Sequence, residues 1–142
     1  MTAQEQRLAN EFLDHATEFV DASERLYARQ PFLLHPTFYC AIHGVELALK
    51  SYLAAHGYTK SRLASRDFGH NLSRLLTEAF SCGDLQSHLS VRDQRTITAS
   101  GKSYSRKAFE YPELVTTVGI GNWRGIARKL ICHARRKVNP KA

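Results

Sequence analysis

The stretch PTFYCAIHGVELALKSYL, residues 36–53, decides the fold of this 142-residue chain. Its apolar residues cover most sides of a helix, which is typical of a helix buried at the centre of a bundle. Pro36 suits the first turn of a helix, and Gly57 suits the position where one ends. The pattern therefore predicts a central helix that begins near Pro36 and ends at Gly57.

Helical periodicity continues on both sides of this stretch. Apolar residues recur at three- and four-residue intervals from about Thr2 to Ala28, and Pro31 stops that helix. Shorter helices are predicted after the N-caps Asn71 and Ser90, because each cap is followed by helical spacing and a closing glycine. The helix after Ser90 is predicted to end near Ser100, with Gly101 after it. A polar connection is predicted over 58–69, and an aromatic-rich irregular connection over 102–121 leads to a last helix over 122–138.

The chain shows no strand alternation, internal repeat or linker, so we expect one all-α domain over 1–142, an up-and-down bundle of four or five helices. With 43% hydrophobic and 23% charged residues, its composition excludes collagen, a disordered tail and a disulfide miniprotein. Three scattered cysteines argue against a closed disulfide framework and against a four-cysteine zinc site. No signal peptide or membrane span is visible, which predicts a cytoplasmic protein without a membrane partner.

Positive charge gathers at the C-terminal end. Residues 114–142 hold seven of the 20 Lys and Arg residues and none of the 13 Asp and Glu residues, so residues 1–113 carry 13 of each. Two interpretations stay open: a solvated helix that aids solubility, and a surface that binds a polyanion, with RNA preferred to a membrane. The helix predicted over 122–138 has one apolar face and one cationic face, which carries Arg124, Arg128, Lys129, Arg135 and Arg136.

Polar residues on the central helix form a second candidate site. His43, Glu46 and Lys50 fall on one stripe, and Glu46 and Lys50 stand at the spacing of an intrahelical ion pair. A His-x-x-Glu pair is half of a metal site, but the Glu-x-x-His repeat of di-iron bundles is not duplicated. We therefore expect no metal and no cofactor, and a buried Glu46 paired with Lys50 or His43. His70 either bonds to backbone at a helix start or lines a pocket against the central helix.

Two segments resemble the HEPN superfamily, the higher eukaryotes and prokaryotes nucleotide-binding domains. Residues 39–53, YCAIHGVELALKSYL, resemble the A-x-E-L-x-L-K-x-Y-L helix of bacterial HEPN-like proteins, and residues 69–76, GHNLSRLL, resemble the G-H-x-L-x-x-L-L helix that follows it. The piece FEYP at 109–112 is also similar to that group. The resemblance covers about residues 35–112 and implies a helical bundle that pairs into a homodimer.

The resemblance also implies a chemistry, metal-independent cleavage of RNA. The family signature is an Arg followed by four to six residues and a His, and Arg128 and His133 match it with four residues between them. In that role Arg128 would hold the scissile phosphate and His133 would act as general base or acid. A five-residue step turns a helix by about 140°, so the side chains of Arg128 and His133 do not share a face of one helix. A composite site in a dimer could bring the Arg128 of one copy close to the His133 of the other.

Three functions therefore stand side by side. The first is a homodimeric endoribonuclease that uses Arg128 and His133, with Arg124, Lys129, Arg135 and Arg136 on the phosphate-binding surface. The second is a catalytically inactive module that dimerises and binds RNA or a nucleotide. The third is an interaction protein whose cationic helix aids solubility or contacts an acidic partner. A nucleotidyltransferase antitoxin as partner fits the toxin–antitoxin arrangement of some HEPN proteins.

Overall fold

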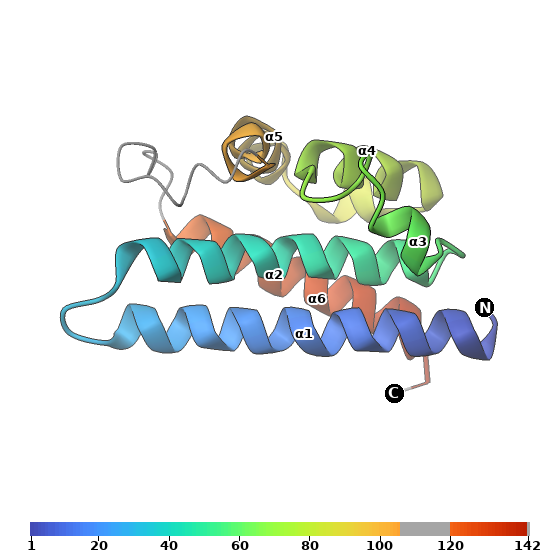
Figure 1. Ribbon diagram of the computed structural model, residues 1–142, viewed down its shortest axis with the longest axis horizontal. Helices are drawn as coiled ribbons and strands as arrows, with labels where there is room; N and C mark the ends of the chain where they lie inside the picture. Colours follow the sequence, from blue (N-terminus) through green and yellow to red (C-terminus); the bar gives the residue numbers. More distant parts are fainter. Residues whose placement is uncertain (106–119, 142) are drawn as a thin grey trace.

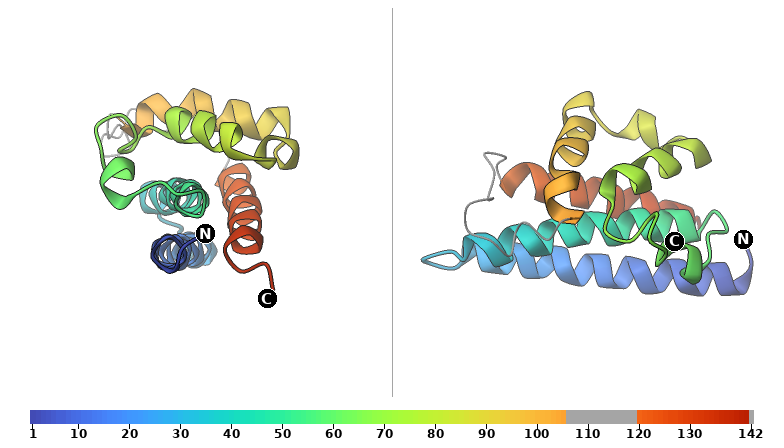
Figure 2. Two further views of the ribbon diagram at one scale, coloured as in Figure 1. Left: turned by 90° about the vertical axis from the view of Figure 1, so that its right-hand side faces the viewer. Right: turned by 45° about the horizontal axis from the view of Figure 1, so that its top comes forward.

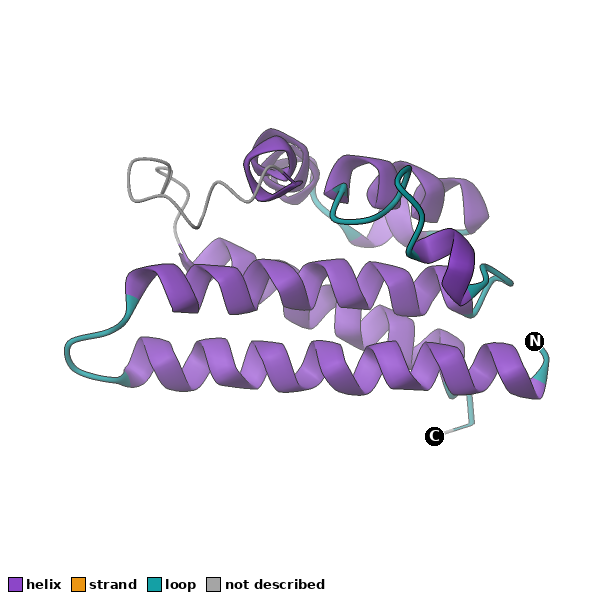
Figure 3. Ribbon diagram, viewed as in Figure 1, coloured by secondary structure: helices purple, strands orange, loops and turns teal. Residues whose placement is uncertain are grey.

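The computed structural model describes residues 1–105 and 120–141, and every regular element in those ranges is a helix (Figure 3). The prediction of an all-α bundle is confirmed. The irregular, aromatic-rich connection predicted over 102–121 was wrong at both ends, because residues 102–105 and 120–121 are helical. The rest of that predicted connection, 106–119, lies outside the described residues. The elements are α1 (Ala3–Ala28), α2 (Leu34–Ala54), α3 (Lys60–Leu63), α4 (Leu72–Cys82), the 3-10 helix η1 (Leu85–His88), α5 (Val91–Ser105) and α6 (Ile120–Val138).

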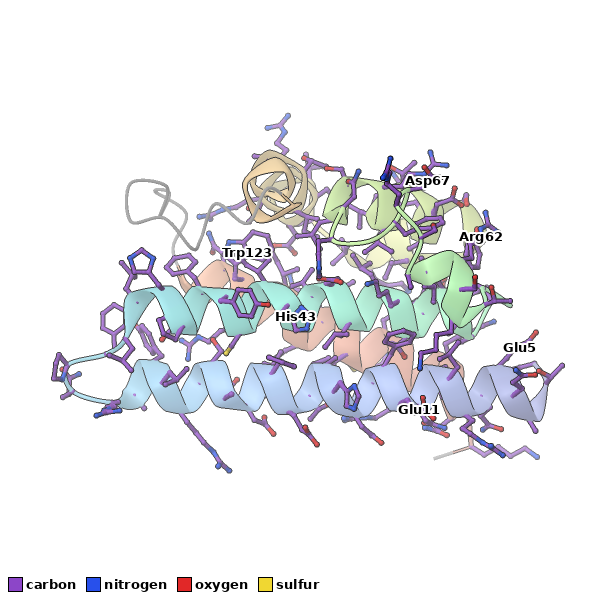
Figure 4. All side chains as sticks on the ribbon, viewed as in Figure 1. Glu5, Glu11, His43, Arg62, Asp67 and Trp123 are labelled. Atoms are coloured by element: carbon purple, nitrogen blue, oxygen red, sulfur yellow. The ribbon has the colours of Figure 1, made fainter. Side chains whose placement is uncertain are left out.

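Three long helices form the main layer of the molecule. Helices α1 and α2 run antiparallel, and α6 packs against both of them (Figures 1 and 2). Every residue from Gly44 to Ala54 is buried, as predicted for a central helix. The predicted apolar face of α6 is also buried, and it includes Trp123, whose side chain Figure 4 labels. Burial of each large apolar side chain contributes about 1.5–3 kcal/mol, so the interface between these helices holds the layer together.

Small residues allow α1 and α2 to approach closely. A methyl group at Gly44 would lie 2.5 Å from the Cγ2 atom of Val20, so only glycine fits at this position. Two buried hydroxyls bridge the helices: Ser23 Oγ donates to the Thr37 carbonyl at 2.8 Å, and Ser51 Oγ donates to the Ala9 carbonyl at 2.7 Å. Because buried hydroxyls need partners, these bonds set the relative position of the two helices.

Helices α3, α4 and α5 form a second layer over α2 and α6 (Figure 2). Helix α5 is seen end-on in Figure 1, so it crosses the long helices, whereas the up-and-down arrangement holds for α1 and α2. The predicted caps are present. Asn71 accepts a hydrogen bond from the backbone of Arg74, and Ser90 accepts one from the backbone of Asp93.

Three predicted boundaries were wrong. Helix α5 does not end at Ser100 but continues through Gly101 to Ser105, which a helix tolerates because an interior glycine costs only about 1 kcal/mol. The polar connection over 58–69 contains α3, a single turn capped by Thr59. Helix α2 ends at Ala54 and not at Gly57. Its start at Leu34 agrees with the start predicted near Pro36, which lies in the first turn where its missing N–H is not needed. Among the described residues no helix is both long and apolar enough to cross a membrane.

Candidate functional site

The four residues predicted for a pocket meet around one buried carboxylate. Glu46 is 1% exposed, and its Oε1 accepts a hydrogen bond from Lys50 Nζ at 2.6 Å. Its Oε2 lies 3.2 Å from His43 Nδ1 and 3.0 Å from His70 Nδ1. A carboxylate only accepts hydrogen bonds, so both imidazoles present an Nδ1–H to it. The predicted pairing of Glu46 with Lys50 and His43 is confirmed, and His70 joins the same group.

The surroundings of this cluster favour a structural role. The His43 ring contacts the Phe19 ring edge-on, with ring centroids 4.5 Å apart, and Figure 4 shows His43 on the side of α2 that faces α1. Since Glu46 lies on α2 and His70 lies just before α4, their hydrogen bond ties the two layers together. His43, Glu46 and His70 have the donor set of a metal site. The Lys50 ammonium, however, already neutralises the Glu46 carboxylate from within the protein.

Several cations of α6 are neutralised within the molecule. Arg128 donates through Nε and Nη2 to both carboxylate oxygens of Glu24 and through Nη2 to Asp21, at 2.6–3.0 Å. These carboxylates hold the pKa of Arg128 above its usual value. Lys129 pairs with Asp93 at 2.6 Å, and Arg124 stacks on the Tyr27 ring.

The arginines in the last turns of α6 differ from Arg128 in that they are open to solvent. Arg135 and Arg136 are both exposed. Within the described part of the chain, neither of them forms an ion pair. The predicted cationic face is therefore divided into a first half that holds α6 to its neighbours and a second half that faces solvent.

His133 lies in a cluster that joins three elements. Its Nε2 is 3.3 Å from Oδ1 of Asp84, and its ring centroid is 4.4 Å from that of His88. Nε2 of His88 is 3.2 Å from Oδ2 of the same Asp84, so one carboxylate bridges both imidazoles. Behind His133, the buried ring of Tyr52 from α2 lies 5.3 Å away.

This cluster borders an open depression of about 360 Å³ that is lined by α6 and η1. Both members of the predicted Arg–His pair line it, but the Arg128 guanidinium is directed to the carboxylates of α1. The lining is cationic and contains no carboxylate among the described residues. It consists of His88, Arg128, Lys129, Cys132, His133 and Arg136.

A second depression has a mixed charge. It measures about 470 Å³ and lies between the start of α1 and the turn from α2 to α3. Glu5 and Glu11 line it together with Arg7 and Lys60, and Figure 4 shows the two acidic side chains on α1. Because both signs of charge are present, this surface does not select an anion.

The environment of His133 favours its neutral form. Burial lowers the pKa of His133 below its ordinary value of 6.5, and the positive charges of His88 and Arg136 act in the same direction. The Asp84 carboxylate opposes them in part. The hydrogen bond from His88 and the charge of His133 in turn lower the pKa of Asp84. A neutral His133 that donates Nε2–H to Asp84 has its lone pair on Nδ1, where it can accept a proton.

We expect the stability of the protein to rise with pH as His133 loses its proton. Between the lowered folded pKa and the ordinary value of 6.5, the unfolded chain binds more protons at this position than the folded chain does. The free energy of unfolding therefore increases with pH across that window, by at most about 1.4 kcal/mol per pH unit for one group. Urea titrations from pH 5 to 8 in a chelating buffer measure this slope. His133→Gln should reduce it, and an unchanged slope in that variant would contradict the assignment.

His88, Asp84 and Tyr52 were missed by sequence reasoning. Asp84 and His88 are four residues apart, directly after Gly83, and this spacing is the only local signal. Their meeting with His133 depends on how α6 packs against η1, which a single sequence does not show. Gly83 is also needed here, because a methyl group at this position would lie 2.6 Å from the Tyr52 hydroxyl.

No protein-family model, curated protein sequence or solved structure matches this chain. The HEPN resemblance therefore stays a sequence-level expectation, and the case for function rests on the site itself.

Proposed function

We propose that this chain binds RNA through the cationic depression on α6. The observation that carries the proposal is that Arg136 and two imidazoles line one open depression, while Arg135 beside them faces solvent without an ion pair among the described residues. Guanidinium groups bind phosphate oxygens through paired N–H donors, and neighbouring cations match successive phosphates of a strand. An acidic protein surface is less well matched, because it lacks the regular spacing of charge along a nucleic acid.

Two further proposals come from the family resemblance. HEPN proteins pair, so we propose a homodimer, with a nucleotidyltransferase antitoxin as a partner in the cytoplasm. Large apolar side chains that are 38–42% exposed at and near the α1–α2 turn support pairing, because such a surface suits a protein contact. These are Tyr27, Phe32, Leu33, Leu34 and Tyr39.

A salt titration tests the RNA-binding proposal. We expect a fluorescently labelled single-stranded RNA to bind the full chain at low salt, measured by fluorescence anisotropy. If Arg135 and Arg136 each contact one phosphate, log Ka should fall against log salt with a slope of about −1.4. A flat dependence, or no binding at low salt, would refute the proposal and favour the interaction protein with a solubilising helix.

The imidazole pair supports RNA cleavage as a second candidate function. His133 could take the proton of a ribose 2′-hydroxyl as its oxygen attacks phosphorus, and His88 could give a proton to the leaving 5′-oxygen. The P–O5′ bond breaks as the P–O2′ bond forms, which leaves a 2′,3′-cyclic phosphate and a 5′-hydroxyl. Arg136 would stabilise the charge that develops on the phosphate oxygens. In this arrangement His88 takes part directly, and Arg128 keeps α6 in place.

Cleavage of end-labelled RNA in EDTA tests this candidate. We expect cyclic phosphate ends from the wild type and a loss of rate of about 10²–10⁴ in both His88→Ala and His133→Ala, since each removes one proton-transfer group. His70→Ala is the control, because its imidazole bonds to Glu46 in the other cluster. Equal products from all four proteins would indicate a contaminating nuclease, and no product from any of them would leave binding as the function.

A further inference from the structure

Three metal-ligating side chains converge beside the depression. Asp84 directly precedes η1, His88 is the last residue of η1, and His133 lies on α6. One ligand atom from each of these side chains lies within 4.8 Å of the other two. Each imidazole Nε2 is 3.2–3.3 Å from a carboxylate oxygen of Asp84. Neighbouring ligands of a tetrahedral ion with metal–ligand bonds of about 2.0–2.1 Å stand about 3.3 Å apart, so each imidazole already lies at that distance from one oxygen of Asp84. Binding of one ion through both Nε2 atoms requires each of them to give up its proton, and requires the exposed Asp84 carboxylate to turn one oxygen toward both rings.

We propose that Asp84, His88 and His133 bind a first-row transition-metal dication such as Zn²⁺. Two neutral imidazoles and one carboxylate are a donor set that such ions accept. Three protein ligands leave a fourth position toward the depression for water or an anion. This proposal does not rest on RNA binding, because the ligands come from the cluster geometry alone. A bound ion would occupy His88 and His133, so it is an alternative to their use in metal-independent RNA cleavage and leaves the RNA-binding proposal unaffected.

The charges around the cluster set the conditions for binding. Asp84 supplies one negative charge, and Arg136 acts on His133 as a nearby positive charge. The Arg128 charge is offset by Asp21 and Glu24, and the Lys129 charge is offset by Asp93. Arg136 is therefore the main repulsive neighbour among the described residues, and an anion in the fourth position would offset it.

The Glu46 cluster is the weaker candidate for the same ion. His43, Glu46 and His70 also place their ligand atoms within 4.8 Å of one another. Lys50 Nζ, however, is 2.6 Å from Glu46 Oε1, so a dication there would have to displace or repel a buried ammonium. Asp84 is 72% exposed, and among the described residues its ion pairs are with histidines only. A direct comparison of the two clusters is therefore informative.

The test is a Zn²⁺ titration of the full chain without a histidine tag, by calorimetry at pH 7.5 in the absence of RNA. A parallel Co²⁺ titration reports coordination geometry through its visible absorption. We expect one Zn²⁺ per chain and intense tetrahedral Co²⁺ bands. Asp84→Asn, His88→Ala and His133→Ala should each weaken binding by about 100-fold or more, since loss of an outer-shell partner alone costs 10–100-fold.

Two variants keep the test specific. His70→Ala removes a ligand of the Glu46 cluster, and Cys132→Ser removes the thiol that lines the depression. Both should bind Zn²⁺ with wild-type affinity. The proposal is overturned if the wild type does not bind Zn²⁺, or if His70→Ala or Cys132→Ser abolishes binding while His88→Ala does not. Circular dichroism of each variant separates loss of a ligand from loss of the fold.

Discussion

Glu46→Gln is expected to lower the free energy of unfolding by about 3–5 kcal/mol. The substitution keeps the size of the side chain but removes its negative charge. The Lys50 ammonium, which is 8% exposed, then stays buried without its carboxylate. His43 and His70 also lose a charged acceptor, so the contact between α2 and the second layer weakens. Urea denaturation followed by circular dichroism measures the change.

Two controls separate charge pairing from a general sensitivity of the helix. Glu18→Gln makes the same chemical change at an exposed position of α1 and should alter stability by less than about 0.5 kcal/mol. The double variant with Glu46→Leu and Lys50→Met removes both charges and should recover much of the loss, because a buried ion pair can be replaced by apolar side chains. A Glu46→Gln protein as stable as the wild type would show that the cluster does not stabilise the fold.

Reversal of two charges at the end of α6 is expected to weaken RNA binding about 100-fold. The variant carries Arg135→Glu and Arg136→Glu. Each arginine is exposed, so its loss should not disturb the core. A hydrogen bond to a charged group contributes about 1.5 kcal/mol or more, and two of them correspond to roughly two orders of magnitude in Kd. Anisotropy titration with labelled RNA, at one fixed salt concentration, gives the ratio of affinities.

The matched control reverses two charges elsewhere. Lys60→Glu and Arg66→Glu change the net charge by the same amount, at exposed positions in and after α3. RNA affinity should change much less in this variant if the depression is the binding site. An equal loss in both variants would mean that RNA responds only to the net charge of the protein, and the depression would lose its special role.

The sequence predicted the helices well because their signals are local. The buried face of α6, the caps at Asn71 and Ser90 and the pairing of Glu46 with Lys50 all follow from spacing within one helix. The end of α5 was wrong because Gly101 was taken as a stop. Glycine permits a helix to end but does not force it to do so, and α5 continues beyond it.

The candidate site was predicted only in part, because its key contacts are distant in sequence. Helical spacing placed Arg128 on a solvated face, but it could not show that Asp21 and Glu24 of α1 pack against that face. Helical spacing also placed His133 at the edge of the apolar face, but it could not show which residues contact His133. Asp84 and His88 reach His133 through tertiary packing alone. Such contacts decide which cations of α6 remain available for a ligand.

The most direct measurement is an NMR titration of the isotope-labelled protein with single-stranded RNA. We expect amide shifts to concentrate on η1 and on the second half of α6, around His88, His133 and Arg136. The mixed-charge depression at the start of α1, near Glu5, should not respond. Shifts centred on that depression, or no shifts at a low salt concentration, would contradict the proposal that α6 binds RNA.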